Sequence, residues 1–472
     1  MKNFITFLLS LSVSIFTAKA VTPSIDNTPK PRIVVLTDIA PADVEADDME
    51  SLVRLLSHAD LFEIEAIITS GGWNSSGGTY PVEWAKFANE VIDAYEKDLP
   101  NLMRRSDQTE FKSITKEEQT QNIGYWPSAT YLRKRTMMGS RSLGVDKLGK
   151  DNDSPGSELL IKLAEEKDSR PIWILVWGGG NTVAQALWKI KNDCDSKRLE
   201  KFVDKIRIYS ITDQDVDWGQ REQHQLSSHK WMRENFGERL MFIWDESAWL
   251  SQNYIGASHW KDYETHIQGK GNLGSVYPHY KWGVEGDSPS FFYIMPVGLS
   301  NPEDPAQGSY GGYFKKSLSN DKSTVCYNNT SEDVSKISRK YEEYFYPSIF
   351  NNFAARMEWA ATGKGNRNPI VIVKGQKGLD PVIIKSAENR SVRLDASKSY
   401  DPDNDNLKIK WWILPEASNY DGKAVVKDAD TATASLLIAA GDSGKSIHII
   451  CEVTDDGNFN LKSYRRVIIN VK

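Results

Sequence analysis

Cysteine is scarce in this chain of 472 residues. The three cysteines, Cys194, Cys326 and Cys451, are odd in number and lie far apart. Small extracellular domains that depend on disulfides use several paired cysteines, so this pattern excludes a disulfide framework. We therefore expect the fold to be stabilised by the burial of apolar side chains.

An excess of positive charge is also missing. The chain has 58 Lys and Arg against 64 Asp and Glu, which gives a formal net charge of -6. Binding to nucleic-acid phosphates depends on clustered positive charge, so nucleic acid is not an expected partner. No segment after the first 20 residues is apolar enough to cross a bilayer, so no membrane insertion is expected.

The first 20 residues have the pattern of a secretory signal peptide. Lys2 supplies a positive charge, residues 4–16 are largely apolar, and residues 18–20 form a small-x-small cleavage site. The apolar run is shorter than the roughly 20 residues that a membrane-spanning helix needs. The sequence therefore predicts a periplasmic or secreted protein from which residues 1–20 are removed.

The remaining chain is too long for one core, because single cores stop growing near roughly 250 to 300 residues. The pattern of apolar and polar residues changes at the loop-forming segment 363–369. Residues 32–362 alternate buried strands with helices, which predicts an α/β domain with a doubly wound, mainly parallel sheet. Residues 369–472 contain short alternating strands without a helical period, which predicts an all-β immunoglobulin-like sandwich.

Particular segments carry the strand and helix patterns of the first domain. The predicted strands are Ile33–Leu36, Glu63–Thr69, Pro171–Trp177 and Ile206–Ile211. The predicted helices are Met49–His58, Tyr80–Lys97, Ser157–Glu166 and Asn181–Ile190. Ligands of doubly wound sheets bind at the carboxyl ends of the strands, so we expect the functional site at that edge.

Carboxylates crowd together directly after the first predicted strand, at Asp38, Asp43, Glu45, Asp47 and Asp48. Carboxylates this close repel one another, and they either bind protons or need a cation. Hard oxygen ligands without a nearby histidine or thiol favour calcium or magnesium over zinc. The alternative is that Asp47 and Asp48 only cap the following helix, whose dipole favours acidic side chains there.

The order of three motifs resembles the nucleoside hydrolases. In that family, an aspartate and the second residue of an aspartate pair hold a calcium ion, as in the segment 38–48. A strand, a glycine turn and a helix start at 176–184 resemble the motif whose backbone carbonyl binds calcium. The segment 286–291 resembles the motif whose aspartate completes the site. The resemblance implies calcium as cofactor, with these ligands: Asp38 or Asp43, Asp48, the Trp177 carbonyl and Asp287.

Three further blocks resemble a bacterial branch of this superfamily. Segments 285–291, 298–302 and 308–312 are similar to cellulose-binding proteins that carry a nucleoside-hydrolase-like domain. The similarity covers roughly residues 32–360, and the C-terminal domain also looks like the one those proteins carry. It implies a carbohydrate or glycoside as the substrate.

The resemblance also implies a mechanism, the hydrolysis of a glycosidic or N-glycosidic bond. A metal-ligating aspartate, here Asp38, would take the proton from a water that attacks the anomeric carbon. Asp47 would hydrogen-bond a sugar hydroxyl, and one displacement would invert the anomeric centre. Asp43 matches the spacing of the family and Asp38 stands at the strand end, so both remain candidates for the first metal ligand.

The chain departs from the family directly before Asp287. Many nucleoside hydrolases have a histidine there that protonates the leaving base, whereas this chain has Gly286. The nearest substitutes are Glu285 and His279, and Glu285 is our candidate for the catalytic acid. If no acid acts, only a good leaving group would react.

Polar and aromatic residues after other strands are predicted substrate contacts, because they should lie at the same sheet edge. They are Trp73, Asn74, Asn181, Asp213, Gln214 and Trp218. For the segment 212–218 the alternative is a solvated loop. Four histidines, His224, His229, His259 and His266, have no metal-ligand spacing and are interpreted as surface or core residues.

The second domain resembles immunoglobulin-like modules of the polycystic-kidney-disease type at residues 394–405. Its Asp401-Pro402-Asp403 turn offers oxygen ligands for a structural calcium, although hydrogen bonds alone hold most such turns. Trp411 and Trp412 should point to opposite faces, one to the core and one to solvent or the neighbouring domain. The predicted strands are Pro369–Val373, Val382–Ile384, Ser391–Leu394, Leu407–Trp412, Ala434–Ile438, Ser446–Val453 and Tyr464–Val471. The domain either binds carbohydrate or is a spacer that packs against the first domain.

Two functions follow from the sequence. One is a secreted calcium-dependent hydrolase, which the ordered motifs support. The other is a carbohydrate-binding protein that kept the fold and lost turnover, which the missing histidine supports. A third hypothesis, a purely structural surface protein, has the least support. The sequence leaves open the sugar, the leaving group and whether the chain forms a homo-oligomer.

Overall fold

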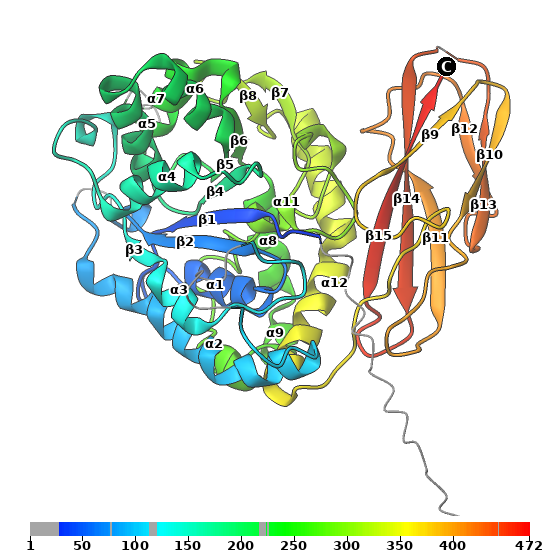
Figure 1. Ribbon diagram of the computed structural model, residues 1–472, viewed down its shortest axis with the longest axis horizontal. Coiled ribbons are helices and arrows are strands. Elements are labelled where there is room, and N and C mark those ends of the chain that lie inside the picture. Colours follow the sequence, from blue (N-terminus) through cyan, green and yellow to red (C-terminus); the bar gives the residue numbers. More distant parts are fainter. Residues whose placement is uncertain (1–27, 76–77, 113–119, 217–222, 224–225, 442) are drawn as a thin grey trace, which may run out of the picture.

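The computed structural model describes residues 28–75, 78–112, 120–216, 223, 226–441 and 443–472. The chain folds into an α/β domain followed by an all-β region of two sheets (Figure 1). In this part of the chain, no helix combines the length and the apolar character that a bilayer crossing requires.

An eight-stranded sheet forms the centre of the first domain, in the order β3-β2-β1-β4-β5-β6-β8-β7. All neighbouring strands are parallel except β7 and β8. Every residue of β1 is buried, as expected for a strand that is covered on both faces. The strands are β1 (Arg32–Thr37), β2 (Glu63–Thr69), β3 (Thr136–Met138), β4 (Ile172–Val176), β5 (Ile206–Ile211), β6 (Met241–Asp245), β7 (Lys315–Leu318) and β8 (Val325–Asn328).

Helices cover both faces of this sheet, and each face has its own apolar cluster. On one face lie α4 (Pro155–Glu165), α5 (Asn181–Asp193), α6 (Ser196–Lys205) and α7 (Ser228–Phe236) (Figure 1). The other face and its flank carry α1 (Asp47–Ser57), α2 (Lys86–Arg105), α3 (Ala129–Lys134), α8 (Ala248–Ser258), α9 (Trp260–His266), α10 (Gly271–Ser275), α11 (Pro289–Ile294) and α12 (Glu332–Thr362). The doubly wound α/β architecture predicted from the sequence is confirmed.

One predicted helix end was wrong. The helix expected to end at Lys97 continues as α2 to Arg105, with Pro100 inside it. Proline weakens a helix interior because it removes one backbone hydrogen bond. Here Leu99 and Leu102 are buried in the core of the domain, and this packing outweighs the local cost.

The C-terminal region consists of two packed sheets, which confirms the predicted sandwich. One sheet has the order β10-β13-β12 and the other β11-β14-β15-β9. The strands are β9 (Val382–Ser386), β10 (Arg390–Asp395), β11 (Leu407–Ile413), β12 (Ala424–Lys427), β13 (Thr433–Ile438), β14 (Lys445–Asp455) and β15 (Lys462–Val471). The short edge strand β12 was not predicted. The segment 369–373 was predicted as a strand but makes only isolated bridges, from Ile370 to Tyr400 and from Val373 to Gln376.

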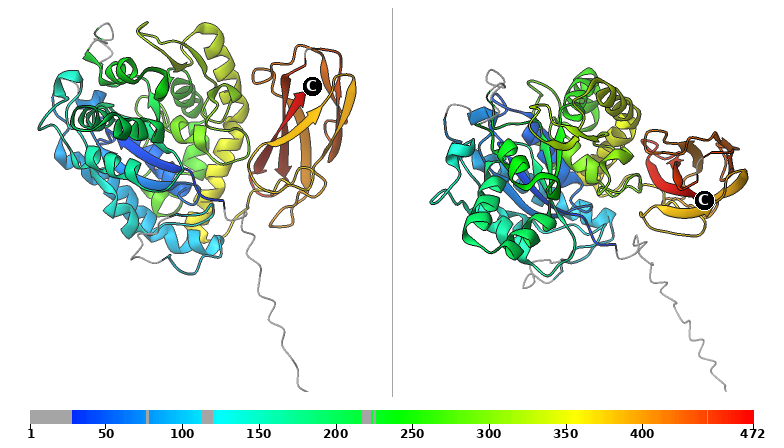
Figure 2. Two further views of the ribbon diagram at one scale, coloured as in Figure 1. Left: turned by 45° about the horizontal axis from the view of Figure 1, so that its top comes forward. Right: turned by 90° about the horizontal axis from the view of Figure 1, so that it is seen from above.

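The sandwich packs against the first domain along α12 (Figure 2). Trp411 is buried in the sandwich core, whereas Trp412 faces the other way and its ring lies 5.3 Å from that of Tyr344. The buried Arg466 donates to the Leu299 carbonyl of the first domain at 2.6 Å. The predicted alternation of the two tryptophans is confirmed, and the second of them serves the domain interface.

Candidate functional site

A cavity of about 510 Å³ opens where β1 and β5 end. Its polar floor consists of five carboxylates, Asp38, Glu45, Asp47, Asp48 and Asp287. No lysine, arginine or histidine is among the described residues that line it. The other lining residues are Trp73, Ile211, Thr212, Gln214, Trp249, Leu250, Asn253, Tyr254, Trp282 and Gly286. The cavity therefore gathers carboxylates without a cationic side chain from the described residues.

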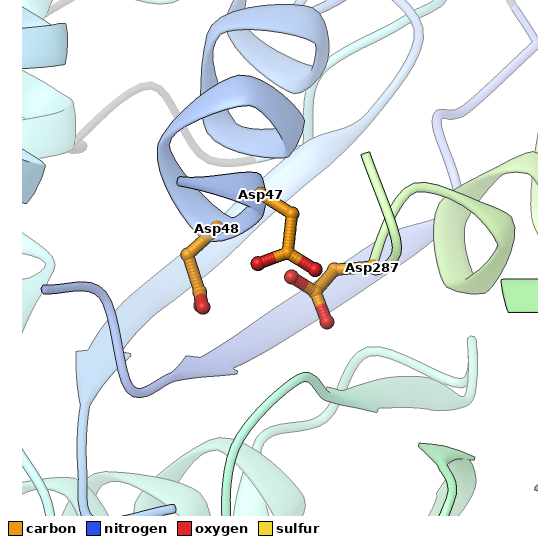
Figure 3. A group of neighbouring side chains, drawn as sticks. All are labelled: Asp47, Asp48 and Asp287. Carbon is orange, nitrogen blue, oxygen red and sulfur yellow. The ribbon is translucent and has the colours of Figure 1, made fainter. Parts of the chain in front are cut away.

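Three of these carboxylates converge from two distant segments. Asp47 and Asp48 open α1, and Asp287 faces them from the loop before α11 (Figure 3). One oxygen of each lies within 4.8 Å of the others. In the described part of the chain, the buried Oδ2 of Asp287 has no hydrogen-bond partner. This spacing suits oxygen ligands around one hard cation.

Burial and mutual repulsion change the acidity of this group. Burial is the largest cause that raises the pKa of Asp48 and of Asp287, and their repulsion by Asp38 and Asp47 raises it further. Thr37 donates a hydrogen bond to Asp48, which acts in the opposite direction. Ionised carboxylates in such a place need a cation, and the residues present fit a divalent one.

Asp38 lies at the end of β1 and forms the inner wall of the cavity. Two glycine turns pack against it. A Cβ on Gly72 would overlap Asp38 Oδ2, and a Cβ on Gly178 would lie 3.0 Å from Asp38 Cβ. The glycines after β2 and β4 therefore allow the backbones to approach this carboxylate closely.

Asp43, the alternative to Asp38 as metal ligand, lies outside the site. Its side chain is exposed and does not line the cavity, and its carbonyl accepts a hydrogen bond from Lys281. Glu45, which was not among the predicted ligands, lines the cavity instead and is hydrogen-bonded to Asp47. The turn between β1 and α1 decides which of these side chains points inward, and sequence spacing does not determine that.

Trp177 and Gln214 are in contact, and of the two only Gln214 lines the cavity. The Trp177 carbonyl, the predicted backbone ligand, accepts a hydrogen bond from the Gln214 side chain. The Trp177 indole donates to Ser290 Oγ at 2.7 Å. Gln214 lines the cavity, as predicted for a substrate contact, and its hydrogen bond uses one of the two lone pairs of the Trp177 carbonyl.

Two predicted substrate contacts point away from the cavity. Asn181 donates from Nδ2 to the Gly144 carbonyl at 2.7 Å. Asp213 accepts from Ser227 Oγ at 2.7 Å, next to the start of α7. Both side chains hold neighbouring loops and neither lines the cavity, so their prediction was wrong.

The other predicted contacts have different outcomes. Trp73 lines the cavity, and its indole donates to the Val216 carbonyl at 2.8 Å. The side chain of Asn74 and the whole of Trp218 lie outside the described residues, so both remain predictions. His229 is a buried core residue, as expected, whose Nε2 accepts from the Gly180 amide at 2.9 Å.

Glu285 and His279, the proposed replacements for the family histidine, also lie outside the cavity. Glu285 is fully buried and forms an ion pair with Arg54 Nε at 2.6 Å. It also accepts from Tyr277 Oη at 2.7 Å. His279 is exposed and interacts with the Tyr280 carbonyl. The assignment of Glu285 as catalytic acid was therefore wrong, because its charge neutralises a buried arginine behind the site.

Gly286 explains why this chain lacks the histidine. A Cβ at this position would lie 2.6 Å from Asp47 Oδ2 and 3.0 Å from Asn253 Oδ1. Asp47 and Asn253 both line the cavity, so any side chain at 286 would displace them. The preceding residue, Glu285, has a φ of 56°, a left-handed conformation that is rare for residues with a side chain. Backbone strain of this kind clusters at functional sites.

An aromatic rim at the mouth of the cavity was not predicted. Trp249, Leu250 and Tyr254 share one face of α8, and Trp282 comes from the loop before Glu285. The side chains of Trp282 and Tyr254 are 72% and 68% exposed. Exposed rings of this size often mark ligand-binding surfaces. The spacing of Trp249, Leu250 and Tyr254 places them on one face of a helix, which the sequence could have indicated. They were missed because only residues at strand ends were considered as substrate contacts.

Two family models match the chain. The model described as cellulose-binding Sde182, nucleoside hydrolase-like domain, matches residues 32–314. The model of the C-terminal domain of cellulose-binding protein Sde0182 matches residues 391–471. The chain belongs to this family. The two models of the Sde182 family thus cover the segments that form the carboxylate cavity and most of the sandwich.

A solved structure agrees with this assignment to the Sde182 family. It is a nucleoside hydrolase-related hypothetical protein from Saccharophagus degradans that is associated with carbohydrate metabolism. The two chains share 30% identity and a TM-score of 0.80, over 94% of this chain and 100% of the other. The effector protein XOO4466 shares 8% identity over 71% of this chain and 96% of its own, with a TM-score of 0.31, too low to carry an argument. No curated protein matches the chain.

Proposed function

We propose that the carboxylate cavity is a calcium-dependent site that hydrolyses a glycosidic or N-glycosidic bond. The observation that carries the proposal is the set of five carboxylates that line the cavity, with no cationic side chain among its described lining residues. Asp48 and Asp287 are assigned as ligands of the ion because their oxygens lie close together and Asp287 Oδ2 has no partner among the described residues. Asp38 is assigned as the third ligand because it lines the cavity at the end of β1 and repels both of them. Asp47, whose oxygens lie equally close, is assigned to a sugar hydroxyl. Oxygen ligands in a flexible arrangement favour calcium.

Calcium, when bound, would polarise a water and hold sugar hydroxyls. The side chains would do the rest of the chemistry. Asp38, at the inner wall, would take a proton from the attacking water, and Asp47 would accept a hydrogen bond from a sugar hydroxyl. The surrounding carboxylates would stabilise the positive charge that develops on the sugar ring.

The aromatic rim supports a sugar as the substrate. Trp282, Tyr254 and Trp73 present ring surfaces around the acidic floor. Aromatic faces suit the apolar faces of sugars, while the floor suits their hydroxyls. The Sde182 family is named for cellulose binding, so we propose β-linked glucosides and plant polysaccharide fragments as the first substrates to test.

Carbohydrate binding without turnover is the second candidate. It is favoured by Gly286, which replaces the proton donor of the nucleoside hydrolases, and by the enclosed position of Glu285. Without an acid on the leaving group, hydrolysis would be confined to good leaving groups. Export by residues 1–20, which lie outside the described part of the chain, remains part of the proposal.

One assay separates the two candidates. Purified protein with calcium is offered aryl glycosides, including ribosides, and cello-oligosaccharides. Calcium-dependent release of the aryl group supports the hydrolase. Saccharide binding without any release supports the binding protein, and a lack of both contradicts a carbohydrate site in this cavity.

The affinity for calcium should fall as the pH is lowered from neutral towards about 4, the ordinary pKa of an aspartate. The pKa values of Asp48 and Asp287 are raised, so protons compete with the ion at a higher pH than for ordinary carboxylates. Each displaced proton lowers the affinity by up to about tenfold per pH unit. Isothermal titration across this range measures the effect, and an affinity that is independent of pH would contradict it.

The same shifts predict how stability depends on pH without calcium. Because their pKa values are raised on folding, the folded state binds more protons than the unfolded state between the two pKa values. The free energy of unfolding should therefore fall as the pH rises from about 4. Thermal unfolding in a chelator measures this, and added calcium should reverse the loss.

Replacing Trp282 by alanine should weaken saccharide binding and leave calcium binding unchanged. Loss of one stacked ring costs about 1 to 2 kcal/mol, or roughly 5- to 30-fold in affinity. Binding of cello-oligosaccharides by titration tests this. Tyr400→Ala, which removes an exposed ring of the second domain, is the matched control. Equal losses in both variants would place the saccharide elsewhere.

A further inference from the structure

A second group of buried oxygens lies where the interdomain linker meets the sandwich. Asp401 precedes β11, Asp455 is the last residue of β14, and Asn366 belongs to the linker 363–369. Their exposed fractions are 7%, 1% and 6%. These side chains share no residue with the lining of the carboxylate cavity.

Only one oxygen of the Asp401 carboxylate is hydrogen-bonded. Its Oδ1 accepts from the Asp403 amide at 2.6 Å and from the Asp405 amide at 3.2 Å. In the described residues, its buried Oδ2 has no partner. The turn thus holds the carboxylate through Oδ1 and leaves Oδ2 available for a ligand.

Asp455 and Asn366 repeat this arrangement. Asp455 Oδ1 accepts from the Leu461 amide at 2.9 Å, the Gly457 amide at 3.1 Å and Asn366 Nδ2 at 3.0 Å. The buried Asp455 Oδ2 and Asn366 Oδ1 have no hydrogen-bond partner within the described part of the chain. Leaving a buried acceptor unpaired is costly, and three in one place call for a ligand.

The three groups are neighbours. Burial raises the pKa of Asp455 to about 6, and repulsion by Asp401 adds to this shift. Asp405 lies on the same side, because a Cβ on Gly457 would overlap Asp405 Oδ2 and would lie 2.6 Å from Asn366 Nδ2. The absence of a side chain at Gly457 therefore lets these groups come together.

In the described structure, no lysine or arginine forms an ion pair with Asp401, Asp405 or Asp455. The nearby arginines, Arg105 and Arg367, both pair with Asp403 at 2.8 Å. The positive charge of this region is thus taken by Asp403.

We propose that Asp401, Asp455 and Asn366 bind a second calcium ion at the domain junction, with water completing its shell. The donors are oxygens only, which favours calcium over zinc. Each is positioned by hydrogen bonds through its other polar atom, so the site is organised before the ion arrives.

The ion would connect the two domains through the linker. The Asn366 carbonyl accepts a hydrogen bond from the indole of Trp359, a residue of α12. The Asn366 side chain is one of the ion's ligands, and the other ligands belong to the sandwich. Calcium at this place would therefore hold the sandwich in a fixed orientation on α12.

The alternative is that a proton is shared between Asp401 and Asp455. The two readings differ for Asp455→Asn, which keeps the Oδ1 acceptor and removes the charge. With a shared proton, the variant is at least as stable as the parent, with or without calcium. With a calcium site, the variant loses the response to calcium and keeps its stability in a chelator.

The test uses the full chain in an Asp287→Asn background, in which the proposed catalytic calcium site is disabled. Equilibrium dialysis with calcium should find one ion bound, and added calcium should raise the melting temperature. Adding Asp455→Asn or Asp401→Asn should abolish both effects, whereas the neighbouring exposed Asp456→Asn should preserve them. Melting in a chelator confirms that each variant is folded.

The outcomes separate this proposal from the proposed function. If the Asp287→Asn protein binds no calcium, or if Asp455→Asn and Asp401→Asn leave its binding intact, the junction site is overturned. If the wild type binds two ions and Asp287→Asn still binds two, the junction site survives only when Asp455→Asn removes one of them. In that case the ligand assignment in the catalytic cavity falls instead.

Discussion

Replacing Asp48 or Asp287 by asparagine should lower calcium-dependent turnover by on the order of 10²- to 10³-fold or more. Both carboxylates are buried at the floor of the cavity and lie close to each other. The amide has the same shape but no charge, so the ion would lose one of its charged ligands. Rates with an aryl glycoside and calcium affinities by titration measure the two effects together.

The stability of these variants provides a control. Because burial and repulsion raise the pKa of Asp287, its charge opposes folding at neutral pH when no cation is present. Asp287→Asn should therefore be at least as stable as the wild type in a chelator, which separates lost chemistry from lost folding. Asp43→Asn, at an exposed position outside the cavity, should keep full activity. Loss of activity in Asp43→Asn but not in Asp48→Asn would reverse the assignment.

Replacing Arg54 by methionine should destabilise the protein by about 3 to 5 kcal/mol. Arg54 is buried, pairs with Glu285 at 2.6 Å and lies over the ring of Phe353 at 4.2 Å. Its removal leaves the Glu285 charge buried without a partner. Urea unfolding measures the loss, and Arg133→Met, which breaks a more exposed ion pair, should cost less than about 1 kcal/mol.

A double variant tests whether Glu285 has a structural role. Arg54→Met with Glu285→Met replaces the whole ion pair by apolar side chains and should recover much of the lost stability. Glu285→Gln alone should lower stability because Arg54 loses its counter-charge. If Glu285→Gln instead lost turnover without a change in stability, Glu285 would be a catalytic residue after all.

The architecture was largely predictable because apolar patterns determine it. The strands β2 and β5 have the bounds that were predicted, since apolar residues, most of them isoleucine, predominate in both. The end of α2 was not predictable, because tertiary burial of Leu99 and Leu102 overrides Pro100. The four-residue edge strand β12 has only one neighbour in its sheet and too few residues to form a pattern.

Site residues that follow directly after strands could be predicted from the sequence. Residues whose position depends on partners far away in the chain could not. Asp38 lies at the cavity because β1 delivers it there, as the fold rule requires. The role of Glu285 depends on Arg54 of α1, a partner that no local pattern reveals. Asp213 follows a strand in the same way as Asp38, yet Ser227 captures its carboxylate. The rim residues Trp282 and Tyr254 belong to a loop and a helix, where the strand-end rule does not apply.

The most direct test of the proposed function is a crystal structure of the protein grown with calcium and a saccharide. We expect one ion between Asp38, Asp48 and Asp287, with oxygen ligands at about 2.3 to 2.6 Å. The sugar should lie between this ion and Trp282. A cavity that holds only water at saturating calcium, or a saccharide bound away from these carboxylates, would contradict a calcium-dependent hydrolase site.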